Sequence, residues 1–302
     1  MLLYTHADCL AHVTPPGHPE SADRLRAVWR GLADLPLIPR ACPAGEAAEV
    51  LCCHPPAYLA RVEAAVPREG WAQLDGDTFL SPGSFGAAMR AVGGVCAAVD
   101  AVLAGEDRTA FVAARPPGHH AETARAMGFC LFGTAAIAAK RALVHHGLSR
   151  VAIVDFDVHH GNGTQDLLWD EGRCLYASSH QMPLYPGTGR PDERGAHGQV
   201  INVALRGGSD GAAMRQAYER TILPAVADWR PDLLIVSAGF DAHAADPLAG
   251  LNWDEADFRW LAARLWEVSG GRVVSTLEGG YDLDALAASA AAYVGELATL
   301  SD

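Results

Sequence analysis

Basic residues are scarce in this chain of 302 residues. Lysines and arginines number 23 against 36 aspartates and glutamates, which gives a net charge of -13. A protein that binds the phosphate backbone of a nucleic acid needs a positive surface. The composition therefore predicts no nucleic-acid partner, and it favours neutral or cationic partners.

Cysteines at C-x-x-C spacing and long apolar runs are also missing. The seven cysteines are an odd number without C-x-x-C spacing, so neither a disulfide framework nor a structural zinc site is indicated. The first residues, MLLYTHADCL, lack a basic segment followed by an apolar one, and no run reaches about 18 apolar residues, the length of a membrane span. We therefore expect a cytoplasmic protein that has no membrane partner.

Apolar residues make up 50% of the chain, enough for a large core. They fall into short β-branched runs that alternate with longer segments rich in alanine and leucine, a pattern typical of βαβ units around a mainly parallel sheet. Strands are expected at 2–5, 109–115, 150–157, 173–178, 199–205, 232–239 and 272–280, and helices at 84–103, 211–227, 254–268 and 283–300. No repeat or long linker divides the chain, so we expect one α/β domain over residues 1–302, with helices flanking a mainly parallel central sheet.

Polar motifs follow four of the expected strands. These strands run into RPPGHHAE, DFDVHHGNG, SAGFDAHAADP and LEGGYD. In open α/β sheets, ligands bind beyond the carboxyl ends of the strands. The sequence therefore predicts a single site that gathers the side chains of His119, His120, Asp155, Asp157, His159, Asp241 and Tyr281.

Three of these residues form a candidate metal site. A strand periodicity of two puts Asp157 and His159 on the same side of the chain, and Asp241 from a distant strand completes the set. An open three-ligand set is typical of catalytic zinc, and ferrous iron and cobalt accept the same donors. The alternative is that the three groups only hydrogen-bond one another. Burying three polar groups without compensation would be costly, which favours the metal.

The adjacent histidines His119 and His120 follow Pro-Pro-Gly, which fixes a turn and confines both rings. They are expected beside the metal. Histidines that do not bind the metal can move protons, because their ordinary pKa lies near neutral pH. We interpret this pair as acid and base groups.

Together the motifs resemble those of the histone deacetylase family of metal-dependent amidohydrolases. They span nearly the whole chain and read GHPESADRL, DGDTFLSPGS, RPPGHHAE, MGFCLF, DFDVHHGNGTQD, YPGTG, AGFDAHAADPLAG and LEGGYD. The resemblance implies the arginase/deacetylase fold, and HHGNGTQ and EGGYD are most similar to the branch that includes the class II deacetylases. It also implies a zinc-dependent deacetylase whose metal ligands are Asp157, His159 and Asp241.

The resemblance further implies a mechanism. His120 takes a proton from the attacking water, the Tyr281 hydroxyl holds the resulting oxyanion, and the histidine pair protonates the leaving amine. The bound metal polarises the water and the amide carbonyl. The weakly active class IIa enzymes carry histidine in place of this tyrosine, so we expect ordinary amidohydrolase activity.

The family geometry pairs Asp155 with His119 and Asn162 with His120. Class I relatives carry aspartate in place of Asn162. An aspartate favours the imidazolium, whereas a neutral asparagine leaves His120 more readily neutral and able to act as the base, with His119 the more cationic partner. The alternative interpretation is that Asn162 only fixes a turn.

The resemblance assigns Phe129 and Tyr185 to the walls of a narrow acyl-chain channel. It also implies a structural potassium ion, held by Asp155, Asp157, the His159 backbone, Ser178 and Ser179.

Leu248 bears on the substrate, because relatives that prefer polyamines carry a glutamate at this position. We therefore expect an acyl-lysine peptide or another small acylated amine. One alternative is an acetylpolyamine deacetylase whose acidic rim comes from Asp77 or Glu20, and another is a non-catalytic module that binds a metal or an acyl ligand. The oligomeric state stays open, a homo-oligomer included.

Overall fold

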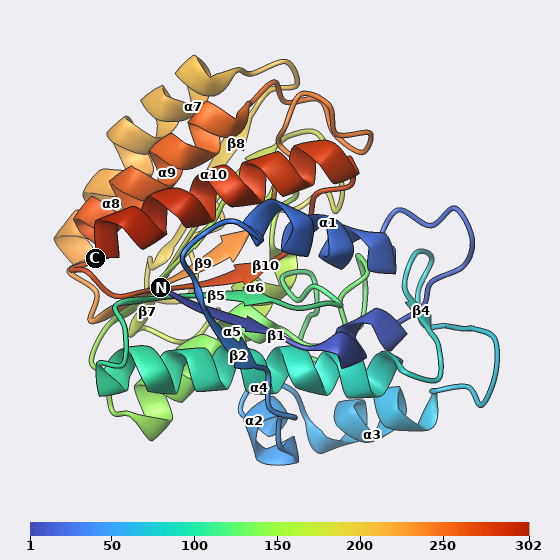
Figure 1. Cartoon of the computed structure of the whole chain (residues 1–302). Coiled ribbons are helices and arrows are strands. Elements are labelled where there is room, and N and C mark those ends of the chain that lie inside the picture. The colour runs from blue at the N-terminus through green and yellow to red at the C-terminus, as the bar shows by residue number, and fades with distance from the viewer. Residues whose placement is uncertain (302) are drawn as a thin grey trace.

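The computed structural model describes residues 1–301 and is built around one eight-stranded parallel sheet (Figure 1). The strand order is β2-β1-β5-β10-β9-β6-β7-β8. The strands are β1 (Leu2–Thr5), β2 (Ile38–Ala41), β5 (Thr109–Ala113), β6 (Val151–Asp155), β7 (Cys174–Gln181), β8 (Val200–Leu205), β9 (Leu233–Ala238) and β10 (Val273–Leu277). A separate two-stranded ribbon pairs β3 (Ala72–Gln73) with β4 (Phe79–Leu80). The predicted α/β class with a parallel central sheet is confirmed.

Helices cover both faces of the sheet (Figure 1). One layer contains α1 (Ala22–Leu32), α7 (Gly211–Ala217), η3 (Tyr218–Ile222), α8 (Leu223–Trp229), α9 (Glu255–Val268) and α10 (Leu283–Ser301). The other is formed by α4 (Ser84–Ala104) and α5 (Thr134–Lys140), which runs into η2 (Arg141–His145), with α2 (Ala47–Leu51) and α3 (Pro56–Ala64) outside α4. The short elements η1 (Ala7–Ala11) and α6 (Asn162–Leu167) lie in loops after β1 and β6.

Two helices, α4 and α10, are long and apolar enough to span a membrane by composition. Both are packed inside the protein, with 67% and 56% of the apolar window buried. In α4, a side chain at Gly93 would collide with the carbonyl oxygen of Pro43, and one at Gly94 would meet the Cys42 sulfur at 2.7 Å. The glycine pair therefore allows the close packing expected for a core helix.

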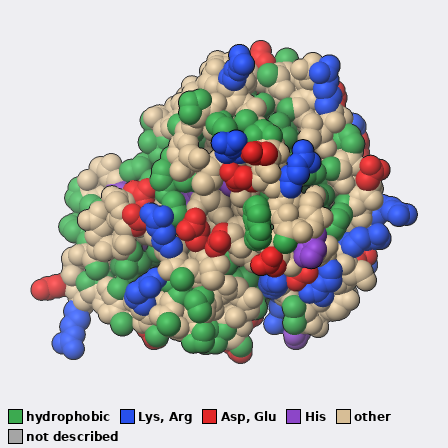
Figure 2. All heavy atoms as spheres, turned by 180° about the vertical axis from the view of Figure 1, so that it is seen from behind, with side chains coloured by type: hydrophobic (Ala, Val, Ile, Leu, Met, Phe, Trp, Pro, Cys, Tyr) green, Lys and Arg blue, Asp and Glu red, His purple; other side chains and the backbone are tan. Residues whose placement is uncertain are grey.

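Edge strand β2 escapes the sequence pattern. All four of its residues are exposed and Pro39 follows its single β-branched residue, Ile38, so no apolar run marks it. On the rear face in Figure 2, acidic and basic side chains intermingle, with no single basic field.

The four strands that precede the polar motifs are neighbours, in the order β5-β10-β9-β6. Because all are parallel, their carboxyl ends meet at one edge of the sheet, where the four motifs form a single loop cluster. Beneath it the Phe156 ring packs on Phe240 and Tyr293, with centroid distances of 5.8 and 5.2 Å. The apolar core thus anchors the loops that carry the polar side chains.

Candidate metal and active site

Asp157, His159 and Asp241 converge, with one potential ligand atom from each lying within 4.8 Å of the others. The Nδ1 atom of His159 is 3.1 Å from Asp157 Oδ1 and 3.1 Å from Asp241 Oδ2. All three residues are buried. The structure therefore brings together the three residues that were predicted from the sequence as metal ligands.

The predicted reason for this convergence is wrong. Strand β6 ends at Asp155, before Asp157 and His159, so strand alternation does not orient their side chains. The chain bends here, and the His159 amide donates to Asp157 Oδ1 at 2.9 Å. This local side chain to backbone bond competes with the strand and turns the carboxylate toward the histidine.

Two glycines allow the backbone to approach the carboxylates. A Cβ at Gly239 would collide with the carboxylate of Asp157, and one at Gly279 would collide with that of Asp241. The Gly279 amide donates to Asp157 Oδ2 at 2.8 Å. The carboxylates are therefore held in fixed positions by the turns after β9 and β10.

The charges of Asp157, His159 and Asp241 favour binding of a cation. Burial, together with the charge of Asp157, raises the pKa of Asp241 to about 7. Against burial, the bonds from Asp157 and Asp241 raise the pKa of His159 to about 10. Two buried carboxylates thus share the single positive charge of His159. A divalent metal that binds oxygen and nitrogen ligands would supply the missing positive charge. The residues fit a zinc or ferrous ion.

A second acidic and histidine group lies elsewhere, at Asp100, His145 and His146. Its carboxylate already accepts two bonds from Arg141, at 2.9 and 2.7 Å, and one from His146 at 2.7 Å. The guanidinium there satisfies the charge, so this group lacks the unmet demand for a cation that marks the buried set.

The two adjacent histidines have different partners. His119 Nδ1 lies 3.1 Å from Asp155 Oδ2, and His120 Nδ1 lies 2.7 Å from Asn162 Oδ1. Although burial opposes it, the charges of Asp157 and Asp155 raise the pKa of His119 well above its usual value. Burial and the charge of His119 lower the pKa of His120 well below its usual value. The arrangement separates a cationic histidine from a neutral one.

Glu278 supports the histidine loop, a contact that the sequence did not reveal. Its Oε2 accepts from the amides of Gly118 and His119 at 2.7 and 3.1 Å, and Ser237 Oγ lies 3.3 Å from Oε1. Burial raises the pKa of Glu278 to about 7. The only signal in the sequence is the glutamate of LEGGYD.

Tyr281 is held from two sides. The guanidinium of Arg24 lies 4.8 Å from the centre of its ring, and the Phe129 ring lies edge-on at 5.8 Å. Arg24 also donates to the carbonyl oxygen of Gly280 at 2.6 Å, which fixes the loop before the tyrosine. Burial raises the pKa of Tyr281 well above its usual value while Arg24 opposes the shift, so the hydroxyl stays protonated and can donate. Arg24 is a second supporting residue that sequence reasoning missed.

These groups open into a cavity of about 200 Å³, lined by Asp77, His120, Gly128, Phe129, His159, Tyr185, Leu248 and Tyr281. The Tyr185 ring lies 5.1 Å from the His120 ring. Phe129 adopts a left-handed φ of 68°, which is uncommon for a bulky residue and marks local strain at the cavity wall. The residues expected in the acyl channel therefore do line one cavity with His120, His159 and Tyr281.

Glu20 does not contribute to an acidic rim, so this expectation is wrong. Its side chain is fully buried and its two carboxylate oxygens accept from Arg115 at 2.8 and 2.7 Å. Asp77 does line the cavity, with Oδ1 accepting from the Gly128 amide at 3.1 Å. Any acidic rim is therefore limited to the Asp77 side.

The residues expected around potassium lie next to the metal set. Asp155 and Ser178 are register partners on β6 and β7. Ser179 follows directly in the strand, and its hydroxyl lies 2.9 Å from the Tyr218 hydroxyl. Because consecutive strand residues face opposite sides, Ser179 has only its carbonyl to offer on the Asp155 side.

A model of the histone deacetylase domain matches residues 18–297. The chain belongs to the histone deacetylase family. It is 39% identical over 285 residues to the histone deacetylase-like amidohydrolase of Pseudomonas aeruginosa, covering 89% of this chain and 74% of that protein. It is 43% identical over 290 residues to an uncharacterized protein of Synechocystis sp., covering 94% of each.

A solved structure agrees with this family membership. The crystal structure of the HDA15 HD domain superimposes with a TM-score of 0.94 at 33% sequence identity, covering 100% of this chain and 92% of that one. The histone deacetylase family consists of hydrolases, and its relatives here include proteins named as deacetylases and amidohydrolases. The predicted family and the arginase/deacetylase fold are both confirmed.

Proposed function

We propose that this member of the histone deacetylase family is a metal-dependent amidohydrolase that removes acetyl or other acyl groups from acyl-lysine side chains or related amides. One observation carries the proposal: a ligand of the candidate metal set, a neutral histidine and a protonated tyrosine line the same cavity, through His159, His120 and Tyr281. A module that only binds a metal or an acyl ligand has no need of the two proton-moving groups.

Asp157, His159 and Asp241 would hold the metal. When bound, a divalent ion supplies Lewis-acid polarisation of a water molecule and of the substrate carbonyl. The donor set suits Zn²⁺, and Fe²⁺ or Co²⁺ fit the same ligands. We further propose K⁺ as a structural ion beside Asp155, with Asp157, the His159 backbone, Ser178 and the Ser179 carbonyl as its other partners.

The catalytic steps belong to three side chains. His120 is the base, because its Nδ1 is engaged by Asn162 and its Nε2 stays free to accept a proton from water. The Tyr281 hydroxyl donates to the oxyanion that forms when the amide carbonyl is attacked. The leaving amine then takes its proton from the histidine pair, in which His119 is kept cationic by Asp155 and Asp157.

The substrate preference follows from the cavity walls. Phe129 and Tyr185 offer aromatic surfaces that suit an aliphatic acyl-lysine stem and exclude water. Leu248 at the cavity provides no counter-charge for a polyamine. Acetylpolyamine deacetylation is the second candidate, and the carboxylate of Asp77 in the same cavity is the observation that favours it.

A side-by-side assay separates these activities. The metal-loaded protein is given acyl-lysine peptides of varied chain length and, separately, acetylated putrescine, cadaverine and spermidine. We expect faster turnover of the acyl-lysine peptides. Faster turnover of the polyamines would reverse the ranking, and no hydrolysis of any amide with metal bound would favour the binding module. A cytoplasmic location is a further prediction that cell fractionation would check, and gel filtration would determine the oligomeric state.

A further inference from the structure

Two adjacent cysteines, Cys52 and Cys53, follow α2 and lie outside the active site. Their sulfur atoms are 3.8 Å apart. Cys52 is exposed and Cys53 is partly exposed, while the other cysteines are buried, namely Cys9, Cys42, Cys96, Cys130 and Cys174. Burial raises the pKa of these five thiols and makes them poor nucleophiles.

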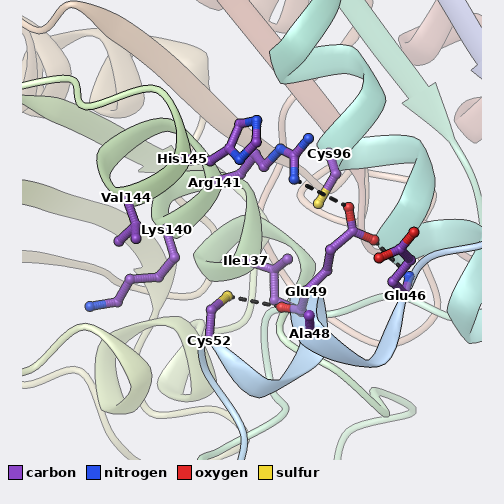
Figure 3. Close-up of a pocket in the computed structure, with 10 residues that line it drawn as sticks. All are labelled: Glu46, Ala48, Glu49, Cys52, Cys96, Ile137, Lys140, Arg141, Val144 and His145. Carbon is purple, nitrogen blue, oxygen red and sulfur yellow. Dashed lines mark hydrogen bonds and ion pairs between the residues drawn. The ribbon is translucent and has the colours of Figure 1, made fainter.

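Cys52 opens into a cavity of about 390 Å³ that Lys140 and Arg141 also line (Figure 3). Its sulfur lies 2.9 Å from the Glu49 carbonyl oxygen, which holds the side chain at the cavity wall. The hydrogen bond between the two thiols lowers the pKa of Cys52, and the Lys140 ammonium adds to this effect against burial. Cys52 is therefore the accessible thiol, with a second thiol beside it, in a cavity lined by both basic (Lys140, Arg141) and acidic (Glu46, Glu49) side chains.

We propose that Cys52 and Cys53 form an oxidation site that a hydroperoxide closes to a disulfide. The Cys52 thiolate attacks the peroxide, the O–O bond breaks, and an alcohol or water leaves as Cys52 becomes a sulfenic acid. The Cys53 thiol then attacks the Cys52 sulfur, the S–S bond forms and water leaves. The thiol pair gives up two electrons and two protons, and one hydroperoxide is reduced.

The closed form is readily reopened. Adjacent Cα atoms lie about 3.8 Å apart across a trans peptide, which is below the usual range of about 4.4–6.8 Å for a disulfide. Strained and exposed disulfides are the ones that thiols reduce easily. The site is therefore reversible in the presence of a dithiol.

The oxidation site is connected to the active-site loop through His54, the next residue. His54 Nε2 accepts from the Gly133 amide at 2.9 Å, and its Nδ1 lies 3.2 Å from the Thr123 carbonyl oxygen. These two contacts fasten both ends of the segment 123–133, which carries Phe129 of the substrate cavity. Closing the disulfide changes the backbone at Cys52 and Cys53, so it loosens the hold of His54 on this segment.

Mass spectrometry of the full-length protein tests the proposal with hydrogen peroxide and tert-butyl hydroperoxide as probes. We expect the peptide that contains Cys52 and Cys53 to lose about 2 Da, the mass of two hydrogens, and to regain it with dithiothreitol. Amide hydrogen exchange over residues 123–133 should rise in the oxidised protein and return after reduction. Neither measurement depends on amidohydrolase activity.

Two matched variants separate the roles of the thiols. Cys53→Ser should stop at the sulfenic acid of Cys52, which dimedone traps, and Cys52→Ser should give neither product. Thermal unfolding of both variants checks that they are folded. If both thiols of the wild type still react with iodoacetamide after peroxide treatment, or if a buried cysteine such as Cys174 is oxidised first, the proposal is wrong.

Discussion

The Nδ1 atom of His120 lies 2.7 Å from the side-chain oxygen of Asn162, whose amide nitrogen donates to Glu122 Oε1 at 2.8 Å. Because the amide nitrogen is held by the carboxylate, the oxygen must face the histidine. His120 therefore carries its proton on Nδ1 and presents Nε2 to the cavity. The neutral side chain of Asn162 thus links His120, the proposed base, to the carboxylate of Glu122.

Replacing Asn162→Asp should damage this chain of contacts. The new carboxylate cannot donate to Glu122 and faces it as a like charge, which we expect to lower both kcat/KM and the melting temperature, with a loss of about 1–3 kcal/mol in stability. The double variant with Glu122→Gln restores a donor, so it should recover most of the stability. Equal stability in the single variant and the wild type would contradict this account of Asn162.

Tyr281→Phe removes the hydroxyl and keeps the ring between Arg24 and Phe129. We expect kcat to fall by about 10²–10³-fold, the cost of one oxyanion donor, with metal content unchanged. Steady-state kinetics on an acyl-lysine peptide measures this effect. Tyr293→Phe is the matched control, because its hydroxyl bonds Ser275 in the core and lies outside the cavity. Full activity of Tyr281→Phe would rule out the proposed role.

Glu278→Ala should lower kcat without removing the metal, since it leaves the amides of Gly118 and His119 without their acceptor. Glu278→Gln keeps an oxygen that can accept from both amides, so we expect it to retain more activity than the alanine variant. Kinetics together with metal analysis compares the two. Equal losses in both variants would show that the charge of Glu278 matters rather than its support of the loop.

His54 should make stability depend on pH. Burial lowers its pKa to about 4, below the ordinary value of about 6.5. Between these two pH values the unfolded chain binds more protons at His54 than the folded protein does. The contribution of neutral His54 to the free energy of unfolding is therefore present above pH 6.5 and is lost as the pH falls toward 4, up to about 3 kcal/mol. Urea unfolding at several pH values measures the slope, and His54→Gln should flatten it. An unchanged slope in the variant would show that His54 is not the source of the pH dependence.

The fold was largely predictable from the sequence because parallel strands buried on both faces are continuous apolar runs. The convergence of Asp157, His159 and Asp241 was predictable for a related reason, since parallel strands deliver their ends to one edge. Edge strand β2 was missed because its exposed residues carry no apolar pattern.

The supporting residues could not be predicted in the same way. Arg24 donates to a carbonyl oxygen 256 positions away in the chain. Glu278 accepts from the amide of Gly118, which is 160 positions away. Such contacts depend on tertiary packing and leave no local signal. Strand β6 was predicted too long because the bond between the His159 amide and Asp157 ends the strand early.

Zinc titration of the metal-free protein, with hydrolysis of an acetyl-lysine peptide followed at each step, tests the central claim most directly. We predict that turnover rises with added Zn²⁺ and saturates at about one ion per chain. Asp241→Asn, with its folding checked by thermal unfolding, should bind the ion more weakly and show little turnover. Undiminished hydrolysis in the metal-free protein, or tight binding of one ion with no hydrolysis of any acyl amide, would contradict the account.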